Sequence, residues 1–310
     1  MVRFYTFLIN PAAGNGHVKK VWPSLEKYLD SQQVNYAVQY TTHPGHASEL
    51  VKEINRIHPQ AIIVVMGGDG TLHEVLNGLQ QNNLEHTLAY IPCGSGNDFA
   101  RGANISADPL VALKKILHQT TPTLIDIGFY KDLNHQNYSF FTNNLGIGFD
   151  ASIVFCANHS YIKRLLNKYR LGFLAYAFSF FKAFLRQRTF TVNVKTNQRS
   201  YTFKHAFLCT ITNHPYFGGG VCLMPKAKLN DGKLDLVIIE KFTTIRFLLI
   251  FLLMILPKQL HVYSKKVHHF QAEEFEISTN ARNHCHADGE DLPKDYYHLT
   301  FCVKKQKFLL

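Results

Sequence analysis

The most constraining feature of this sequence is an alternation of apolar runs, glycine-rich loops and helix-like segments over residues 4 to 92. The run Ala61–Met66, AIIVVM, is apolar throughout, as a strand covered on both faces must be. Leu72, Val75, Leu76 and Leu79 then recur with the spacing of one helix face. This alternation predicts a parallel sheet wrapped by helices. By the same criteria we expect strands at 4–9, 34–40, 61–66 and 88–92, and helices at 18–29, 47–57 and 72–79.

The pattern changes after residue 125, where short strand-like runs follow one another through turn-like links. Such runs are typical of a mainly antiparallel domain. Two apolar segments, Tyr161–Arg188 and Phe242–Leu260, interrupt them and are predicted to be helical. We therefore predict an α/β domain at 1–125 and a β-rich domain at 126–303, with the tail at 304–310 packing back on the first domain. The strand-like runs are TLIDIGF, YSFFTNNLGIG, FTVNVKT, HAFLCTIT, LDLVIIE and FEISTN.

Three loops at the ends of predicted strands carry the chemistry: NPAAGNG, GGDGT and CGSGN. The first two lack the spacing of a dinucleotide fingerprint or a P-loop, and each of the three alone could be a tight turn. Glycines let backbone N–H groups approach an anion, and a helix N-terminus favours negative charge there. Asp69 in the second loop would repel a phosphate unless a metal ion bridged the two. This edge of the sheet therefore predicts a nucleotide bound with Mg²⁺.

The formal net charge of +11 limits the partners that we expect. Such a charge suits nucleic acid, an anionic membrane surface or a polyanionic substrate. The chain has no helix-turn-helix, zinc-finger or RNP signature, so we expect no nucleic acid partner. Its six cysteines form no C-x-x-C pair, which is typical of free thiols in a reducing compartment.

The apolar segments bear on the membrane. The longest uninterrupted apolar run, Phe247–Leu256, is shorter than the ~20 residues that a spanning helix needs. The N-terminus lacks the form of a signal peptide, because a glycine-rich turn interrupts it. We therefore expect a cytoplasmic protein that associates peripherally with a membrane.

The ordered motifs resemble the catalytic domain of the diacylglycerol kinase family, which includes bacterial lipid kinases, sphingosine kinases and ceramide kinases. The resemblance spans residues 4 to 303 and implies an α/β domain like that of NAD kinases and phosphofructokinases, followed by a mainly antiparallel β-sandwich. It also implies ATP-dependent phosphorylation of a lipid hydroxyl in a cleft between the domains. The matching motifs are NPAAGNG, TTHPGHA, GGDGTLHEVLNG, IPCGSGNDFAR, YFGGGVCLMPKAKLNDGKLDLVII and ADGE.

The resemblance assigns the nucleotide to the first three loops and to one threonine. Thr41, rather than Thr42, fits the family's spacing to the following Gly45 and Ala47. Ser95 stands where many bacterial members carry threonine. The implied ATP-binding residues are Asn10, Pro11, Ala12, Ala13, Gly14, Thr41, Gly67, Gly68, Asp69, Gly70, Thr71 and Ser95.

The resemblance also implies two acidic sites in the second domain. Asp288 matches the proposed general base, which takes the proton of the attacking hydroxyl as the γ-phosphoryl group transfers. Asp231, with the backbone carbonyls of Lys228 and Lys233, matches a structural Mg²⁺ site. Both aspartates precede a glycine, so each could also belong to a hairpin turn. Asp69 is the second expected catalytic carboxylate, acting on metal or on water.

The resemblance makes the substrate a lipid in our leading hypothesis, and we expect the two apolar segments to line its entrance. Tyr161–Arg188 mixes aromatic and basic residues, as interfacial helices do, although ordinary packing would explain it equally well. The motifs do not separate diacylglycerol, phosphatidylglycerol, a prenol and a sphingoid base. Alternatives are an NAD kinase-like enzyme with a soluble substrate and a non-catalytic, nucleotide-regulated membrane-binding protein. A homodimer is the default expectation for the assembly.

Overall fold

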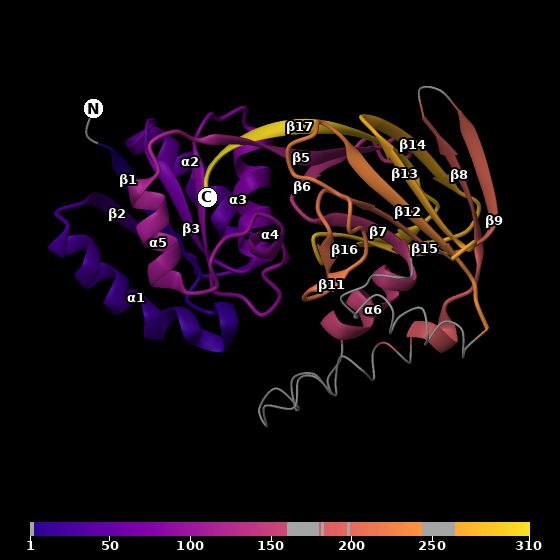
Figure 1. Ribbon diagram of the computed structural model, residues 1–310, viewed down its shortest axis with the longest axis horizontal. Coiled ribbons are helices and arrows are strands. Elements are labelled where there is room, and N and C mark those ends of the chain that lie inside the picture. Colours follow the sequence, from indigo (N-terminus) through magenta and orange to yellow (C-terminus); the bar gives the residue numbers. More distant parts are fainter. Residues whose placement is uncertain (1–2, 160–179, 181–182, 197–198, 244–263) are drawn as a thin grey trace.

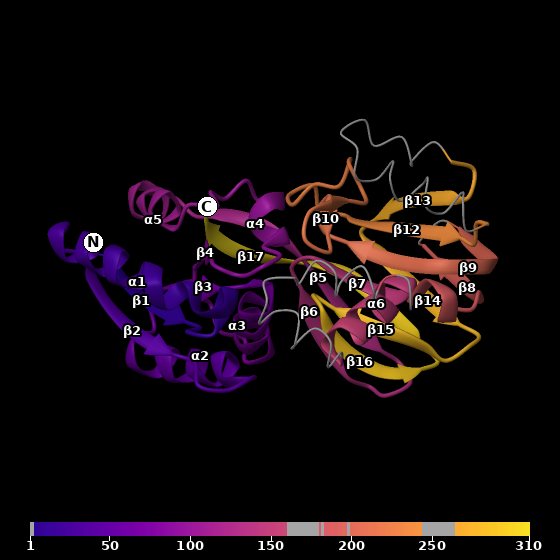
Figure 2. The same ribbon diagram turned by 90° about the horizontal axis from the view of Figure 1, so that it is seen from below.

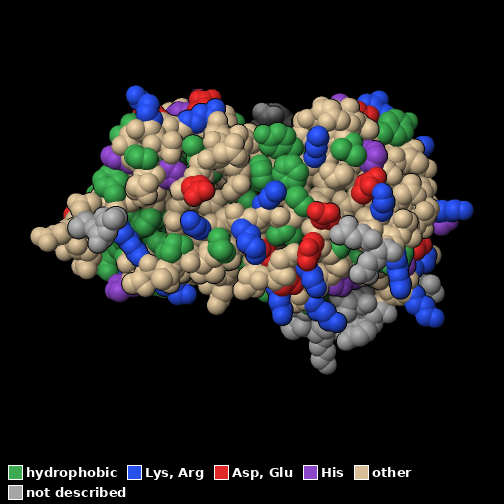
Figure 3. Space-filling model, turned by 90° about the horizontal axis from the view of Figure 1, so that it is seen from above, with side chains coloured by type: hydrophobic (Ala, Val, Ile, Leu, Met, Phe, Trp, Pro, Cys, Tyr) green, Lys and Arg blue, Asp and Glu red, His purple; other side chains and the backbone are tan. Residues whose placement is uncertain are grey.

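The computed structural model describes residues 3–159, 180, 183–196, 199–243 and 264–310. Two parts lie side by side along the long axis of the molecule (Figure 1). Within the described ranges, no helix is long and apolar enough to cross a membrane. Most of the predicted helices Tyr161–Arg188 and Phe242–Leu260 falls outside these ranges. Lys and Arg side chains are spread over both parts of the face shown in Figure 3, interspersed with acidic ones.

The first part is built on a parallel sheet in the order β2-β1-β3-β4. All four strands match the predicted ones to within a residue at each end, so the prediction of a parallel sheet is confirmed. Every residue of β4 and most of β3 are buried, as expected for strands covered on both faces. The strands are β1 (Phe4–Ile9), β2 (Asn35–Tyr40), β3 (Ile62–Gly67) and β4 (Leu88–Pro92).

Helices cover both faces of this sheet (Figures 1 and 2). Because side chains alternate along a strand, Ile63 and Val65 of β3 pack towards α2 and α3, whereas Val64 and Met66 pack towards α1 and α5. Each face thus has its own apolar core. The helices are α1 (Ala13–Ser31), α2 (His46–Ile57), α3 (Asp69–Gln81), α4 (Asp98–Gly102) and α5 (Pro109–His118).

The second part is an antiparallel β-sandwich, as the sequence predicted. Its long strand β9 pairs with β7, β8 and β12, all antiparallel. Helix α6 (Phe149–Asn158) packs on β15 and β16 (Figure 2). The strands are β6 (Tyr138–Phe141), β7 (Asn144–Gly148), β8 (Phe190–Lys195), β9 (Ser200–Thr212), β10 (Tyr216–Phe217), β11 (Val221–Cys222), β12 (Leu234–Glu240), β13 (Val267–Ala272), β14 (Glu274–Thr279), β15 (Asn283–Ala287) and β16 (Glu290–Asp295).

Two long strands join the parts. β5 (Thr123–Asp132) and β17 (His298–Leu309) run antiparallel to each other along almost their whole length. β17 pairs with β14 of the sandwich at one end and runs parallel to β4 of the first sheet at the other, through Phe308 and Leu309. The yellow ribbon of β17 in Figure 1 shows this crossing. The domain division at residue 125 stays a prediction.

One predicted strand is two in the structure. The run YSFFTNNLGIG breaks at Thr142 and Asn143, between β6 and β7. The backbone N–H groups of Thr142 and Asn143 donate to the carboxylate of Asp288 instead of extending β6. A partner distant in the sequence therefore interrupts the strand, and no local pattern announces it.

Candidate active site

The loops after β1 and β3 are joined at the carboxyl edge of the parallel sheet. The side-chain amide of Asn10 donates to the hydroxyl of Thr71 over 2.9 Å, and its carbonyl oxygen accepts from the backbone N–H of Ala12 over 3.0 Å. One side chain thus fixes its own loop and ties it to the first turn of α3. This is the edge at which open α/β sheets bind ligands.

The loop after β4 lies against the loop after β3. A Cβ atom added to Gly94 would meet the Cα atom of Gly68 at 2.5 Å, so only glycine allows this approach. Gly14 of the first loop has a φ of +58° and lies against the backbone carbonyl of Cys93. The three predicted loops therefore meet at one place.

A pocket of about 490 Å³ opens between these loops. Thr41 and Thr42 both line it, so the structure does not choose between them. The predicted ATP-binding residues that line the pocket are Asn10, Ala12, Ala13, Thr41, Gly68, Gly70 and Thr71. Those that do not are Pro11, Gly14, Gly67, Asp69 and Ser95.

The pocket wall includes residues to which sequence analysis gave no role. Glu290 reaches it from the second domain, and a Cβ on Gly70 would lie 3.2 Å from its carboxylate. Glu74 also lines the pocket, and its carboxylate accepts from the backbone N–H groups of Gly45 and Ala47 at the start of α2. Both glutamates lie inside motifs that carry the family resemblance, GGDGTLHE and ADGE. Their place in these motifs is the sequence signal that could have identified them as site residues. The pocket is also lined by Thr42, His43, Pro44 and Gly94, which are not among the predicted ATP-binding residues.

Asp69 lies behind the pocket at the start of α3. Its carboxylate accepts from the backbone N–H groups of Asp98 and Phe99, over 3.1 and 3.2 Å. Burial, followed by repulsion from the carboxylate of Asp98, raises the pKa of Asp69 to about 6. Both carboxylates border Gly96: a Cβ there would lie 3.2 Å from Oδ2 of Asp69 and 3.9 Å from Oδ2 of Asp98. Such a pair is the oxygen-rich, doubly acidic donor set that a divalent cation prefers.

Asp98 ties this acidic pair to the second domain. Its carboxylate forms an ion pair with Arg101 at 2.7 Å and accepts from the backbone N–H of Gly219 over 2.8 Å. Burial raises the pKa of Asp98, and these donors offset part of that rise. The glycine run Gly218–Gly220 thus packs against the start of α4.

Asp288 lies at the turn between β15 and β16, in the left-handed region with a φ of +51°. Its carboxylate accepts from three consecutive backbone N–H groups, those of Thr142, Asn143 and Asn144, over 2.8 to 3.1 Å. Burial alone would raise its pKa, but the hydrogen bonds, led by that from His73, hold the pKa below its usual value. Asp288 is therefore a buried, ionised carboxylate in a structured cradle, which is more than a hairpin turn requires.

His73 is the site residue that sequence analysis passed over. It lies in the first turns of α3, and its Nδ1 is 3.0 Å from the Asp288 carboxylate. Burial acts to lower its pKa, but the contact with Asp288 outweighs burial and raises it. The side chain of Asp288 has no exposed surface and that of His73 is 13% exposed. This contact brings the first domain and the second together at the candidate base.

Further buried polar residues lie next to the backbone groups that bind Asp288. Asn143 Oδ1 lies 2.7 Å from Nε2 of His214, and the backbone N–H of Tyr216 donates to Nδ1 of the same ring. Full burial lowers the pKa of His214 to about 4, so this ring is neutral at pH 7. The side-chain amide of Asn144 is buried and its Nδ2 has no hydrogen-bond partner among the described atoms.

The candidate structural metal site is an exposed turn anchored at the domain junction. The Asp231 carboxylate accepts from the backbone N–H of Lys233 over 3.1 Å and from Gln271 over 3.0 Å. The N–H of Gly232 donates to the buried carboxylate of Asp126 on β5 over 2.7 Å. Hydrogen bonds to Gln271 and Asp126 thus hold both sides of this turn. One carboxylate with the carbonyls of Lys228 and Lys233 still fits the oxygen ligands of Mg²⁺.

Comparison with known proteins identifies the family. Residues 5–129 match the profile of the diacylglycerol kinase catalytic domain, and residues 144–300 that of the YegS C-terminal NAD kinase β-sandwich-like domain. A Bacillus subtilis (strain 168) protein with the provisional name lipid kinase YtlR is 34% identical over 290 residues, which cover 92% of each chain. The diacylglycerol kinase of the same strain is 26% identical over 308 residues, covering 97% of this chain and 96% of that one.

Solved structures agree on the fold. A Bacillus anthracis str. Sterne structure described as a diacylglycerol kinase superposes with a TM-score of 0.68 at 21% identity, covering 99% of this chain and 96% of that chain. Two domain profiles in order, and a relative sharing a third of its residues over nearly the full length, establish the relationship. The chain belongs to the diacylglycerol kinase catalytic-domain family of lipid kinases.

Proposed function

We propose that this protein transfers the γ-phosphoryl group of ATP to the hydroxyl of a lipid, diacylglycerol or a similar molecule, in the cleft between its two domains. One observation carries the proposal: the contact of His73 with Asp288 holds a buried carboxylate of the second domain against the helix that borders the nucleotide pocket. A phosphoryl donor and a proton acceptor are thereby brought to one place.

The pocket of about 490 Å³ is the proposed ATP site. Its wall contains the glycines at the start of α3, where backbone N–H groups and the helix dipole attract phosphate oxygens. Glu290 closes the pocket from the second domain. The phosphate end of the nucleotide would thus face the domain that contributes Asp288.

Mg²⁺ is the proposed metal cofactor at Asp69. The carboxylates of Asp69 and Asp98 repel each other, and that repulsion makes a divalent cation favourable beside them. When bound, the cation offsets the charge on the phosphates. These two side chains would hold it, and Arg101 and Gly219 orient Asp98 in that role. A second Mg²⁺ at Asp231 is proposed to be structural.

Asp288 is the proposed general base, with His73 as its partner. Because the Asp288 side chain has no exposed surface, an acceptor hydroxyl reaches it only when the contact with His73 opens, or through the imidazole itself. In either route the backbone N–H groups from Thr142 to Asn144 keep the carboxylate ionised and ready to accept a proton.

The test is transfer of labelled γ-phosphate from ATP, with Mg²⁺, to a panel of acceptors in mixed micelles. The panel holds diacylglycerol, phosphatidylglycerol, a prenol and a sphingoid base, with NAD as a soluble acceptor. Label in an organic-phase phosphomonoester supports the proposal and names the lipid. Label on NAD alone refutes lipid specificity while retaining the nucleotide site, and label in inorganic phosphate alone refutes a kinase role for Asp288.

A further inference from the structure

A second cavity, of about 770 Å³, lies in the second domain, apart from the nucleotide pocket. It opens between α6, the residues just before β8, and the hairpin of β15 and β16. Figure 2 shows α6 beside β15 and β16. The two cavities share no lining residue. No role for this cavity follows from phosphoryl transfer at Asp288. Its described lining is Ser152, Phe155, Cys156, His159, Ala183, Arg186, Gln187, Arg188, Thr189, Ala281, Arg282, Asn283, His284 and Lys294.

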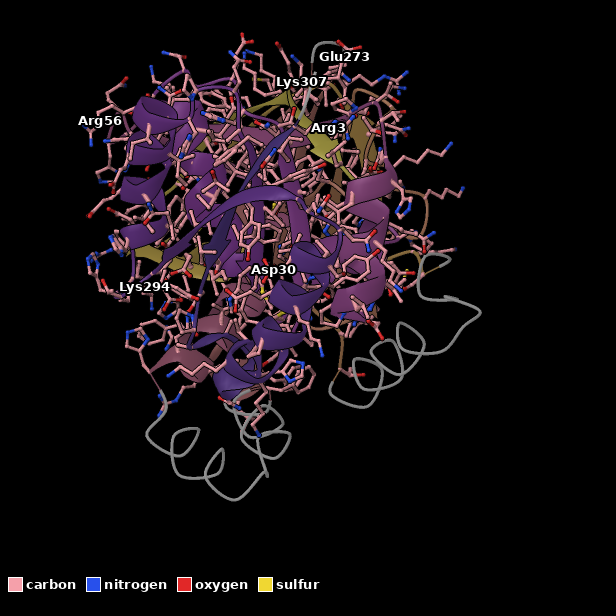
Figure 4. The ribbon with its side chains drawn as sticks, turned by 90° about the vertical axis from the view of Figure 1, so that its left-hand side faces the viewer. Arg3, Asp30, Arg56, Glu273, Lys294 and Lys307 are labelled. Carbon is pink, nitrogen blue, oxygen red and sulfur yellow. The ribbon has the colours of Figure 1, made fainter. Side chains whose placement is uncertain are left out.

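The lining is strongly basic. Arg186, Arg188, Arg282 and Lys294 contribute four cations, and none of the described lining residues is acidic. Arg282 is partly neutralised, with Asp295 at 3.7 Å. For Arg186, Arg188 and Lys294, the described part of the chain supplies no carboxylate within ion-pair distance. Lys294 projects at the edge of the molecule in Figure 4. Among the described residues these three cations thus form no ion pair, and Asp291 is the carboxylate beside the cavity, 3.5 Å from Nδ1 of His159.

The floor of the cavity is polar and ordered. The hydroxyl of Ser152 donates to the carbonyl oxygen of Gln187 over 2.8 Å, and the Gln187 amide reaches Asn283 at 3.4 Å. All three residues are buried. One wall is aromatic, because Phe155 stacks between His159 and His284 with ring centroids 4.3 Å apart on each side. The cavity is therefore a shaped, polar recess with basic side chains around it.

We infer that this cavity is a binding site for a phosphate group, either that of an anionic phospholipid head group or that of a free phosphate ester. The guanidinium group of arginine presents a fork of N–H donors that matches phosphate oxygens. Two arginines close together in the chain, such as Arg186 and Arg188, can donate to the same phosphate. The volume exceeds what a bare phosphate fills and leaves room for a glycerol-sized head group. The inference stands apart from the proposed function, because it concerns binding alone.

The position of the cavity joins it to the candidate active site. Helix α6 supplies Ser152, Phe155 and Cys156 to the cavity wall, and His159 follows its last residue. At the end of the same helix, Asn158 donates to the carbonyl of Gly289, next to Asp288, and to the carboxylate of Asp291, both over 3.2 Å. A ligand that orders α6 would thus also act on the turn that presents the candidate base.

Cys156 provides a direct probe of occupancy. It lines the cavity and is partly exposed, whereas Cys93, Cys209, Cys222 and Cys285 are buried. Cys302 is partly exposed elsewhere and serves as the internal control thiol. The experiment measures the rate of maleimide labelling of both thiols by mass spectrometry in the full-length protein. The additions are inorganic phosphate, glycerol 3-phosphate, vesicles of phosphatidylcholine with phosphatidylglycerol, or vesicles of phosphatidylcholine alone.

The expected result is protection of Cys156 and not of Cys302. At a ligand concentration of about ten times its dissociation constant, labelling of Cys156 should slow by about tenfold. Protection by phosphate or glycerol 3-phosphate assigns the site to a free ester. Protection only by the phosphatidylglycerol vesicles assigns it to a lipid head group. Unchanged labelling of Cys156 in every arm overturns the inference.

A charge-matched pair of variants separates this cavity from general charge attraction. Arg186→Gln with Arg188→Gln removes two exposed cations of the cavity, and Lys52→Gln with Arg56→Gln removes two exposed cations of α2 on the first domain (Arg56 is labelled in Figure 4). Each basic residue near an anionic surface strengthens binding by about fivefold, so loss of two should weaken binding of the protecting ligand to the cavity variant by about 30-fold. The control should bind as the parent does. Equal losses in both variants would contradict a specific site.

Discussion

Nδ1 of His73 in the first domain lies 3.0 Å from the Asp288 carboxylate in the second. The two residues are 215 positions apart in the chain, and β5 and β17 are the strands that hold their domains together. The contact pairs a histidine whose pKa is raised with an aspartate whose pKa is lowered. It therefore links three properties that can be measured separately: domain contact, pH response and phosphoryl transfer.

The first prediction concerns stability and pH. His73→Ala should destabilise the fold by about 1–3 kcal/mol near neutral pH, because it removes a hydrogen bond to a buried charge. The folded pKa of His73 is raised, so its charged contribution is complete below its unfolded pKa and is lost as pH rises through the folded pKa. For Asp288 the folded pKa is lowered, so its contribution is lost as pH falls through that value.

Urea unfolding of the parent and of His73→Ala across pH measures this difference. The difference in unfolding free energy between the two proteins should be largest between the folded pKa of Asp288 and that of His73, and should become smaller at higher pH. His205→Ala, which alters an exposed histidine of the second domain, is the matched control. A gap of constant size at every pH would show that His73 stabilises by packing and not by charge.

The second prediction concerns Mg²⁺ at Asp69. Because the pKa of Asp69 is about 6, protonation below that pH should weaken Mg²⁺ binding. The Mg²⁺ concentration for half-maximal activity should therefore rise as pH falls below about 6. Asp98→Asn removes the repulsion and should move this rise to lower pH, while lowering activity. If Asp98→Asn left the pH of the rise unchanged, the two carboxylates would not be coupled.

The third prediction concerns the contact between the two loops at Gly68 and Gly94, which both line the proposed ATP pocket. Gly94→Ala should cost about 1–3 kcal/mol, because the new methyl would meet the backbone of Gly68 at 2.5 Å. The displaced loops should also raise the KM for ATP. Gly70→Ala is the control for unfolding alone, because Gly70 also lines the pocket but its methyl would meet only the flexible end of Glu290, at 3.2 Å. Equal unfolding free energies for the two variants would contradict a glycine requirement at position 94.

The fourth prediction concerns the exposed turn at Asp231. If this turn holds a structural Mg²⁺, chelation with EDTA should lower the melting temperature of the parent but not that of Asp231→Asn. The Asn230→Ala variant, which alters the neighbouring exposed side chain, should respond to EDTA as the parent does. If EDTA left the melting temperature of the parent unchanged, the turn would hold no structural Mg²⁺. Its role would then be limited to its hydrogen bonds with Gln271 and Asp126.

Local sequence patterns were enough to predict the parallel sheet and the place where its loops meet. Periodicity and glycine content are properties of neighbouring residues, and β1, β3 and β4 follow them directly. Helix α5 was missed although Asp108 and Pro109 mark its start. The Asp108 carboxylate caps the helix by accepting from the backbone N–H of Leu110 and Val111. Asp-Pro at this position is therefore a local sequence signal for the start of α5.

The contacts that define the candidate base could not be predicted in this way. The sequence pointed to Asp288 only by resemblance, and it gave His73 no distinction from the other histidines. Their pairing depends on how two domains meet, and the break after β6 depends on the same carboxylate. Interactions between distant segments leave no periodicity in either segment. The sequence therefore supplies the residue types of the site, and the fold supplies their partners.

The most direct test of the account is the rate of γ-phosphoryl transfer from ATP to a lipid acceptor by the parent and by Asp288→Asn, with ATP binding measured in parallel. The account predicts a lipid phosphomonoester from the parent, and a kcat about 10²–10⁴-fold lower in the variant, as expected for loss of a general base. ATP affinity should be unchanged, because Asp288 does not line the nucleotide pocket. Transfer by Asp288→Asn at the parental rate would contradict the central claim.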